Sequence, residues 1–252
     1  MSRRGRIIAF GVSAVGLTVA LAVGLAGLPL LGSPISDYAR LLNRLAPVQR
    51  RVTDVVSAIT FDYRGIDTLF EEFILFSAVT GISVILRPLA DEVRQLPADQ
   101  APDRRIPPPS PAVGMLAVLL SPLLVLMALE TVTHGQLTPG GGFQGGVIMA
   151  SGLYVIYLAT DYATVDRFQP TALLEASDGI GAAGYVAVGL LGLFVGAPFL
   201  ANVVGLGHSG NLVSGGTIAL LNAVVGVEVA GAFAILGSEF LDQVAVIRQR
   251  RR

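Results

Sequence analysis

Long apolar runs alternate with short polar segments along most of this chain. Each run has membrane length or approaches it with its flanking residues, as Val147–Ala159 does when Phe143 and Tyr162 are included. A helix rises about 1.5 Å per residue and needs about 20 mainly apolar residues to cross a bilayer's hydrocarbon layer. The pattern therefore predicts an all-α, polytopic membrane protein with six transmembrane helices. They are Ile7–Leu31, Leu69–Leu89, Ala112–Thr133, Val147–Ala159, Ile180–Leu200 and Leu212–Leu236.

The first run, Ile7–Leu31, follows arginines at positions 3, 4 and 6. This arrangement suits either a signal peptide or a retained transmembrane helix. The run is 25 residues long, whereas the apolar region of a signal peptide has about 7–15 residues. We therefore favour a retained helix.

Two glutamates limit the second run. Its fully apolar part, Phe73–Leu86, is too short to span the hydrocarbon layer alone. Spanning requires Glu71 and Glu72 to lie near one interface, with Arg87 marking the other end.

Between these two spans, Pro34–Ile59 has apolar positions every three or four residues, with arginines among them. This spacing predicts an amphipathic helix, bent near Pro47 and too polar to span. It suits a helix lying along the membrane surface or along a neighbouring chain, or else a helix of a small extramembrane domain. The first interpretation is favoured because no other extramembrane segment is available to form a core with it. The apolar positions are Ile35, Tyr38, Leu42, Leu45, Val48, Val52, Val55 and Ile59.

A proline-rich segment divides the chain. Pro107, Pro108 and Pro109 stand in a stretch that also carries many charged residues, which is typical of an extended or flexible linker. We expect three parts: a first module at residues 1–89 with two transmembrane helices and the amphipathic helix, a linker at 90–111, and a second module at 112–252 with four transmembrane helices.

The distribution of arginine predicts the orientation. Six spans place both termini on one side of the membrane, together with the linker and the Ala159–Ser177 loop. That side holds twelve arginines and the opposite side five. By the positive-inside rule, the termini are cytoplasmic and the chain is a multi-pass protein of the cell membrane.

Composition narrows the classes of function. The chain is 53% hydrophobic and 14% charged, against roughly 25% charged in soluble domains. It has no cysteine, which excludes disulfides, iron–sulfur clusters and thiolate zinc sites. The net charge of −1 gives nucleic-acid binding no support. No phosphate loop, nucleophile–base pair or metal-ligand spacing is present, so we expect no catalytic residue, cofactor or metal site.

The most unusual segment is His134–Gly146, between two apolar runs, in which six of thirteen residues are glycine. Glycine permits close approach of another backbone, and proline ends a helix. The segment therefore predicts a tight break between two helices that packs against a neighbour, so that valine at position 141 would harm assembly. Its motif residues are Pro139, Gly140, Gly141, Gly142, Phe143, Gly145 and Gly146. His208 before Gly215–Gly216 suggests either a second, related hairpin or coincidence.

Ionisable groups inside spans are costly and usually functional. Glu228 lies near the middle of the last span, with Asn222 on the same helix and no basic residue in any span centre. Burial favours a protonated side chain. Two roles stay open for Glu228: a proton-carrying group, or a hydrogen-bonded structural contact.

Two further sets of polar residues are candidates for an ion or proton path. Glu130 and His134 are four residues apart and suit either a proton relay near the outer surface or a helix-end ion pair. A second set precedes the second span and suits either cation attraction or an ordinary helix start. Its members are Asp62, Arg64, Asp67, Glu71 and Glu72.

The His134–Gly146 segment closely resembles the signature of the B-type component of Mrp-type multisubunit Na⁺/H⁺ antiporters. The resemblance continues through Ser214–Ile218, Leu220–Asn222 and Val227–Ala230, and covers about residues 112–245. Phe61–Glu71, followed by Arg87, is similar to the C-terminal tail of the A-type component of the same antiporters. That family usually has a small residue where Phe70 stands, which questions the close packing there.

The resemblance implies an A-type tail fused to a B-type component, in a complex related to the pumping arm of respiratory complex I. It implies partner subunits of the A, C, D, E, F and G types, and Na⁺ and H⁺ as transported ions. Because the chain has no lysine, it lacks the lysine–glutamate relay of the large subunits. The expected role is accessory and non-enzymatic: completing the ion path and holding the complex together. The alternative is a membrane subunit of an energy-converting hydrogenase or a similar redox-driven pump.

Overall fold

The structure, a computed structural model, describes residues 3–28, 36–86, 110–160 and 171–249. All regular structure in these ranges is helical. The helices are α1 (Arg3–Ala26), α2 (Asp37–Arg50), α3 (Val55–Ala58), the π-helix η1 (Ile59–Tyr63), α4 (Gly65–Leu86), α5 (Pro111–Thr133), α6 (Gly142–Ala159), α8 (Thr171–Phe194) and α9 (Thr217–Gln249). By internal contacts the chain forms two units, residues 1–41 and 42–252.

The all-helical, polytopic membrane fold is confirmed. Within the described ranges, five helices are long and apolar enough to cross a membrane: α4, α5, α6, α8 and α9. The sixth predicted span falls on α1, whose apolar part, Phe10–Ala26, is shorter than the other five. The predicted linker at 90–111 lies outside the described residues except for Ser110 and Pro111, which open α5.

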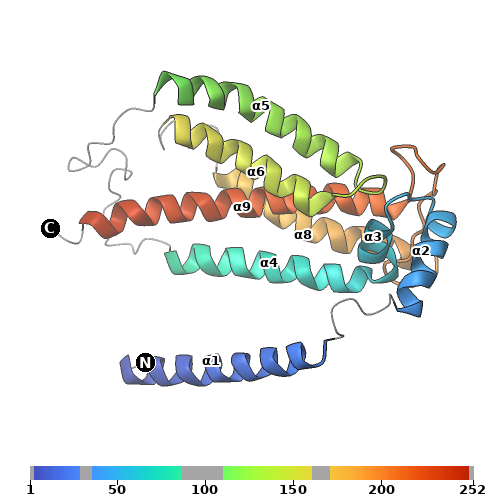
Figure 1. Cartoon of the computed structure of the whole chain (residues 1–252), viewed down its shortest axis with the longest axis horizontal. Coiled ribbons are helices and arrows are strands. Elements are labelled where there is room, and N and C mark those ends of the chain that lie inside the picture. Colours follow the sequence, from blue (N-terminus) through green and yellow to red (C-terminus); the bar gives the residue numbers. More distant parts are fainter. Residues whose placement is uncertain (1–2, 29–35, 87–109, 161–170, 250–252) are drawn as a thin grey trace. The chain divides into compact units, whose positions relative to one another are not determined.

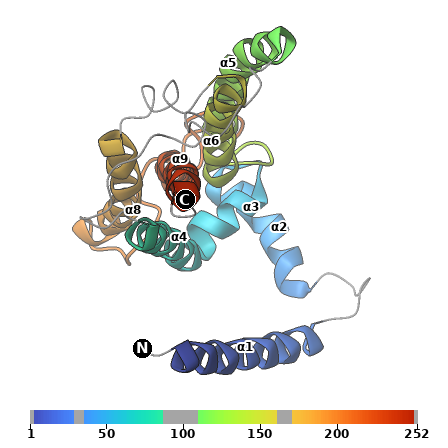
Figure 2. The same ribbon diagram turned by 90° about the vertical axis from the view of Figure 1, so that its left-hand side faces the viewer.

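In the second unit, α9 is the central helix. Figures 1 and 2 show α4, α6 and α8 arranged around it, with α5 beyond α6, and the same pairs are in contact. Sixty-one per cent of the apolar stretch of α9 is buried inside the chain, against 17–33% in the other four spans. Different faces of α9 therefore contact α4, α6 and α8.

Small residues let α6 and α8 approach α9 closely. A Cβ atom added to Gly146 would lie 2.7 Å from the Val229 side chain, and one added to Gly181 would lie 2.3 Å from that of Glu228. In a membrane, dispersion contacts rather than the hydrophobic effect hold helices together, so close approach is a main source of stability. Glycine at these contacts thus permits the bundle to form.

The segment before α4 is not one continuous helix. We predicted a helix as far as Ile59, but α2 ends at Arg50 and Arg51 adopts φ 56°, which breaks the helical path. Asp54 then starts α3, because its carboxylate accepts hydrogen bonds from the backbone N–H groups of Val56 and Ser57. Pro47 lies inside α2.

This segment packs against the chain's own helices. Ala46, Val52 and Ala58 are fully buried in a core that also contains Tyr185 of α8 and Ile218 of α9. We had considered only extramembrane segments as partners for this core, whereas its partners lie on the candidate spans α8 and α9. Residues of α8 and α9 supply the other half of this core.

Candidate functional site

The glycine-rich motif packs closely against α9 of the same chain. Gly140 and Gly141 adopt φ values of 144° and 129°, and the N–H of Gly142, the first residue of α6, donates to Oδ1 of Asn222 at 2.9 Å. A Cβ atom on Gly142 would lie 2.3 Å from the carbonyl oxygen of Asn222. The neighbour that the motif accommodates therefore includes α9, so a side chain there disturbs the fold of this chain before any contact with other subunits.

Asn222 connects three segments. Besides accepting from Gly142, its amide nitrogen donates to Oγ of Ser57 at 3.1 Å and to the carbonyl oxygen of Ile218 at 3.1 Å. The side chain is fully buried. We had noted Asn222 only as a polar residue near Glu228, since a single sequence does not show which residues a buried amide meets.

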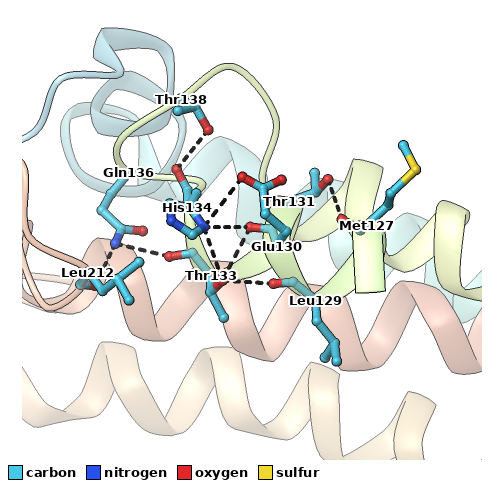
Figure 3. A network of polar contacts seen from close by, with 9 residues as sticks. All are labelled: Met127, Leu129, Glu130, Thr131, Thr133, His134, Gln136, Thr138 and Leu212. Carbon is cyan, nitrogen blue, oxygen red and sulfur yellow. Dashed lines mark hydrogen bonds and ion pairs between the residues drawn. The ribbon is translucent and has the colours of Figure 1, made fainter. Parts of the chain in front are cut away.

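Gln136 fixes the remainder of the loop. Its side-chain nitrogen donates to the carbonyl oxygen of Leu212 at 2.6 Å and to that of Thr133 at 3.2 Å (Figure 3). The backbone carbonyl oxygen of Gln136 accepts from the backbone N–H groups of Thr53 and Asp54, each at 3.2 Å. The loop after α5 thereby joins the turn before α3 to the loop that leads into α9.

Glu130 and His134 form a contact at the end of α5, as Figure 3 shows. Nδ1 of His134 lies 3.5 Å from a Glu130 carboxylate oxygen and 3.0 Å from the Glu130 carbonyl oxygen. The Glu130 side chain is 60% exposed. An exposed pair of this kind contributes about 0–1 kcal/mol. The geometry suits a helix-end ion pair, and the alternative role in a proton path stays a prediction.

The polar residues before α4 do not converge on one site. Asp62 pairs with Arg50 at 2.8 Å and accepts a hydrogen bond from Asn202 at 3.0 Å. Arg64 instead pairs with Asp67, in the first turn of α4. Asp62 and Arg64 thus pair with different partners, and a role of this set in cation attraction stays a prediction.

The other members of that set lie on different faces of α4. Glu71 is exposed, whereas Glu72 is buried in the bundle. Phe70, the residue that questioned close packing, is 63% exposed and therefore leaves the packing of the bundle intact.

Asn202 links Asp62 to the start of α9. It donates to Asp62 and to the carbonyl oxygen of Gly215 at 2.9 Å, and its Oδ1 accepts from the N–H of Thr217 at 2.9 Å. An asparagine side chain therefore caps the first residue of α9, as Asn222 does for α6. Both helices begin directly after glycines with positive φ. The local likeness agrees with related hairpins, which stay a prediction.

Outside the spans, Asp54 is a titratable group whose pKa is shifted. Burial raises the pKa of this carboxyl group, and the two backbone hydrogen bonds at the start of α3 lower it in part. The cap is therefore held at some electrostatic cost.

Glu228 is fully buried, and neither of its carboxyl oxygens has a hydrogen-bond partner. Two more buried acids face the same region, Glu72 from α4 and Asp178 from α8. The sequence pattern did not reveal this grouping, because it placed Glu72 at the interface and Asp178 just before the predicted span Ile180–Leu200. Among the described residues, no group of three His, Asp or Glu side chains is arranged to hold a metal ion.

Comparison with known proteins agrees with the resemblance of the motif. Residues 112–235 match a family model described as a domain related to the MnhB subunit of Na⁺/H⁺ antiporter. An uncharacterized protein of Methanocaldococcus jannaschii is 29% identical over 192 residues, which are 71% of this chain and 73% of that protein. The B-type component of the Na⁺/H⁺ antiporter of Bacillus subtilis is 33% identical over 87 residues, 34% of this chain and 60% of the relative.

Two solved complexes contain similar chains. One is the membrane-bound sulfane sulfur reductase, an archaeal respiratory membrane complex: its chain has a TM-score of 0.68 and 27% identity, covering 94% of this chain and 98% of its own. The other is the Mrp complex of Dietzia sp. DQ12-45-1b, with a TM-score of 0.68 and 26% identity. There the likeness covers 97% of this chain but 26% of the other, so this chain spans about a quarter of that relative's length.

Proposed function

Because this chain belongs, through residues 112–235, to the family related to the MnhB subunit of Na⁺/H⁺ antiporters, we propose that it is an accessory membrane subunit of a multisubunit secondary antiporter. The assembly exchanges Na⁺ or another monovalent cation for H⁺. The observation that carries this proposal is that the family match includes both the glycine motif and the part of α9 that the motif receives. The matched part of the chain is thus one packed unit.

The role is accessory and not enzymatic. The chain contains no lysine and therefore lacks the lysine–glutamate relay of the large antiporter subunits. It helps to complete an ion path at an interface between subunits and holds neighbouring subunits together. Its partners are antiporter subunits of the A, C, D, E, F and G types.

Residues 1–89 correspond to the tail of an A-type component fused ahead of a B-type component. Supporting this, the likeness to the Dietzia chain extends over 97% of the present chain, beyond the 112–235 family match, and covers 26% of that longer chain. The linker at 90–111 marks the join between the two modules.

The protein resides in the plasma membrane with both termini in the cytoplasm. The excess of arginine on the side of the termini supports this orientation. Residues 134–146 then lie on the outer side, together with the turn before α3.

A redox-driven assembly is the second candidate. The observation that favours it is the likeness to a chain of the sulfane sulfur reductase, which covers nearly the whole of both chains. In such an assembly this chain has the same accessory role, and the energy comes from electron transfer in other subunits.

Affinity purification in mild detergent distinguishes the two candidates. The chain is tagged, and its copurifying subunits are identified by mass spectrometry and assayed for iron. An antiporter predicts large membrane subunits without iron, whereas iron–sulfur subunits overturn the antiporter assignment in favour of the redox-driven assembly.

A further inference from the structure

Three acidic side chains are buried where α4, α8 and α9 meet. Relative to the accessible surface of each residue, Glu72 is 4% exposed, Asp178 is 4% exposed and Glu228 is 0% exposed. Each lies on a different helix, and the three helices are in mutual contact. The three groups are near enough for each ionised carboxylate to repel the other two.

The packing around these residues supports their proximity. Gly181, three residues after Asp178 on α8, lies directly against Glu228. Gly231, three residues after Glu228 on α9, lies against the backbone N–H of Asp178. On α4, Leu69 belongs to the same core as Val229, and Val79 packs with Ala232. Glu72 therefore stands at the level of Glu228 in the bundle.

The carboxyl oxygens have unused hydrogen-bonding capacity. Both oxygens of Glu228, Oε2 of Glu72 and Oδ1 of Asp178 are buried without a hydrogen-bond partner. Ionised oxygens that are buried without a partner have lost their water without replacement, which is strongly unfavourable. The arrangement is stable only if the charge is reduced by a bound ligand.

On the helices packed around the cluster, as far as the structure describes them, no basic group faces it. The sequences of α4, α6 and α8 contain no arginine, lysine or histidine, and the only basic residue of α9 is Arg248, far along the helix toward its C-terminus. The hydroxyl of Tyr185, on α8, donates to the carbonyl oxygen of Gly65. That of Tyr154, on α6, donates to the carbonyl oxygen of Phe233.

The remaining acids near the cluster are directed elsewhere. Glu71 on α4 and Glu175 on α8 are exposed, and Asp62 of η1, which contacts both α4 and α9, is paired with Arg50. Glu239 lies further along α9 and is half-buried. Within the described residues, the three buried carboxyl groups thus have no cation to neutralise them.

We propose that Glu72, Asp178 and Glu228 form one proton-binding site, shared by three helices in the membrane interior. Protons fit this site better than a metal cation, because no three acidic side chains of the described residues come close enough together to coordinate one. A proton neutralises a carboxylate directly and needs no coordination shell. Because the groups repel each other, uptake at one position depends on occupancy at the other two.

The use of this site in transport rests on the proposed function. In an antiporter, a group that binds protons inside the membrane and releases them during the exchange cycle supplies part of the proton path. Asp178 and Glu72 then belong to that path together with Glu228.

Infrared difference spectroscopy of the full chain in its purified complex tests the site. A protonated carboxyl group gives a C=O stretching band that an ionised carboxylate lacks, and the band shifts in D₂O. We expect such a band at neutral pH in the wild type, reduced in Glu228→Gln, Glu72→Gln and Asp178→Asn. Glu175→Gln, which removes an exposed acid from α8, serves as the matched control and leaves the band unchanged.

A shared site makes a second, sharper prediction. Replacing Glu228 by glutamine removes one repelling group, so the band of the other two must disappear at a lower pH than in the wild type. The proposal is overturned if the wild type shows no protonated band at neutral pH. It is also overturned if each substitution removes a separate band without shifting the others. If one variant fails to assemble, the other two carry the same test.

Transport measured on the same preparations separates this proposal from the proposed function. If the complex exchanges cations for protons but the band behaves as in ordinary exposed acids, the site fails and the function stands. If the band behaves as expected but the complex shows no exchange, the function fails and the site stands.

Discussion

Replacing Asn222 by alanine tests the contact that joins the glycine motif to α9. The change removes the acceptor of the Gly142 N–H, which is buried beside it, and the donor to Oγ of Ser57. It leaves the backbone of α9 as it is, because the third contact of the side chain, to Ile218, lies within that helix. The loss therefore falls on the contacts between segments.

The magnitude follows from what each partner loses. A buried N–H left without an acceptor costs about 1–3 kcal/mol. An interhelical hydrogen bond in a membrane contributes about 0.6 kcal/mol on average and up to about 1.7 kcal/mol, which bounds the Ser57 contact. We expect a total destabilisation of about 2–5 kcal/mol, and hence a melting temperature lower by on the order of 4–20 °C.

Thermal unfolding of the purified complex, followed by loss of helical circular dichroism, measures this effect. Asn211→Ala is the matched control, because Asn211 is exposed and its hydrogen bonds to other described residues involve only its backbone. A surface change of that kind shifts stability by about 0.5 kcal/mol at most. Equal melting temperatures for the two variants would refute the role assigned to Asn222.

Three further predictions concern the same bundle end. Gly146→Val should lower the yield of folded protein far more than Gly114→Val. A Cβ atom at Gly146 lies 2.7 Å from Val229, whereas nothing lies within 4 Å of one at Gly114. Equal yields of the two variants would contradict this. Asp62→Asn should destabilise the protein by about 1–3 kcal/mol, since the Arg50 pair is largely buried, while Asp67→Asn, at an exposed pair, should cost about 0–1 kcal/mol. Burial raises the pKa of Asp54, so its stabilising effect is present at acidic pH and lost as the pH rises through the folded-state pKa. Asp54→Asn should therefore gain stability relative to the wild type between acidic and neutral pH, and melting curves across that range with the opposite trend would exclude this.

The spans and the break between α5 and α6 were predictable from the sequence. Long apolar runs determine the first, and Pro139 with its glycines determines the second. The glycines also indicated that something packs closely there. They did not indicate what, because the same small surface suits a helix of this chain or a helix of another subunit.

The contacts of the polar residues were less predictable. Arg64 was expected to neutralise a nearby carboxylate, and it pairs with Asp67. Asp62 takes Arg50 and Asn202 instead, which are 12 and 140 residues away. The helical path between α2 and η1 determines that choice. That path depends on the positive φ of Arg51, a conformation that is not expected of arginine.

The buried acids show a similar limit. Glu228 was predicted as an isolated acid in a span. The two acids grouped with it lie next to apolar runs, Glu72 at the start of one and Asp178 just before another. Which faces of α4 and α8 turn toward α9 depends on the glycine contacts between helices. In the sequence, the short spacing between Asp178 and Gly181 was the available indication that Asp178 lies on a face of α8 that packs against another helix.

Reconstitution into liposomes tests most directly whether this chain acts as one part of an assembly. The complete assembly, the assembly lacking this chain, and the chain alone are compared for proton flux driven by a gradient of Na⁺. We expect flux from the complete assembly and none from the other two preparations. Cation-dependent proton flux from the chain alone, or undiminished flux from the assembly without it, would contradict the account.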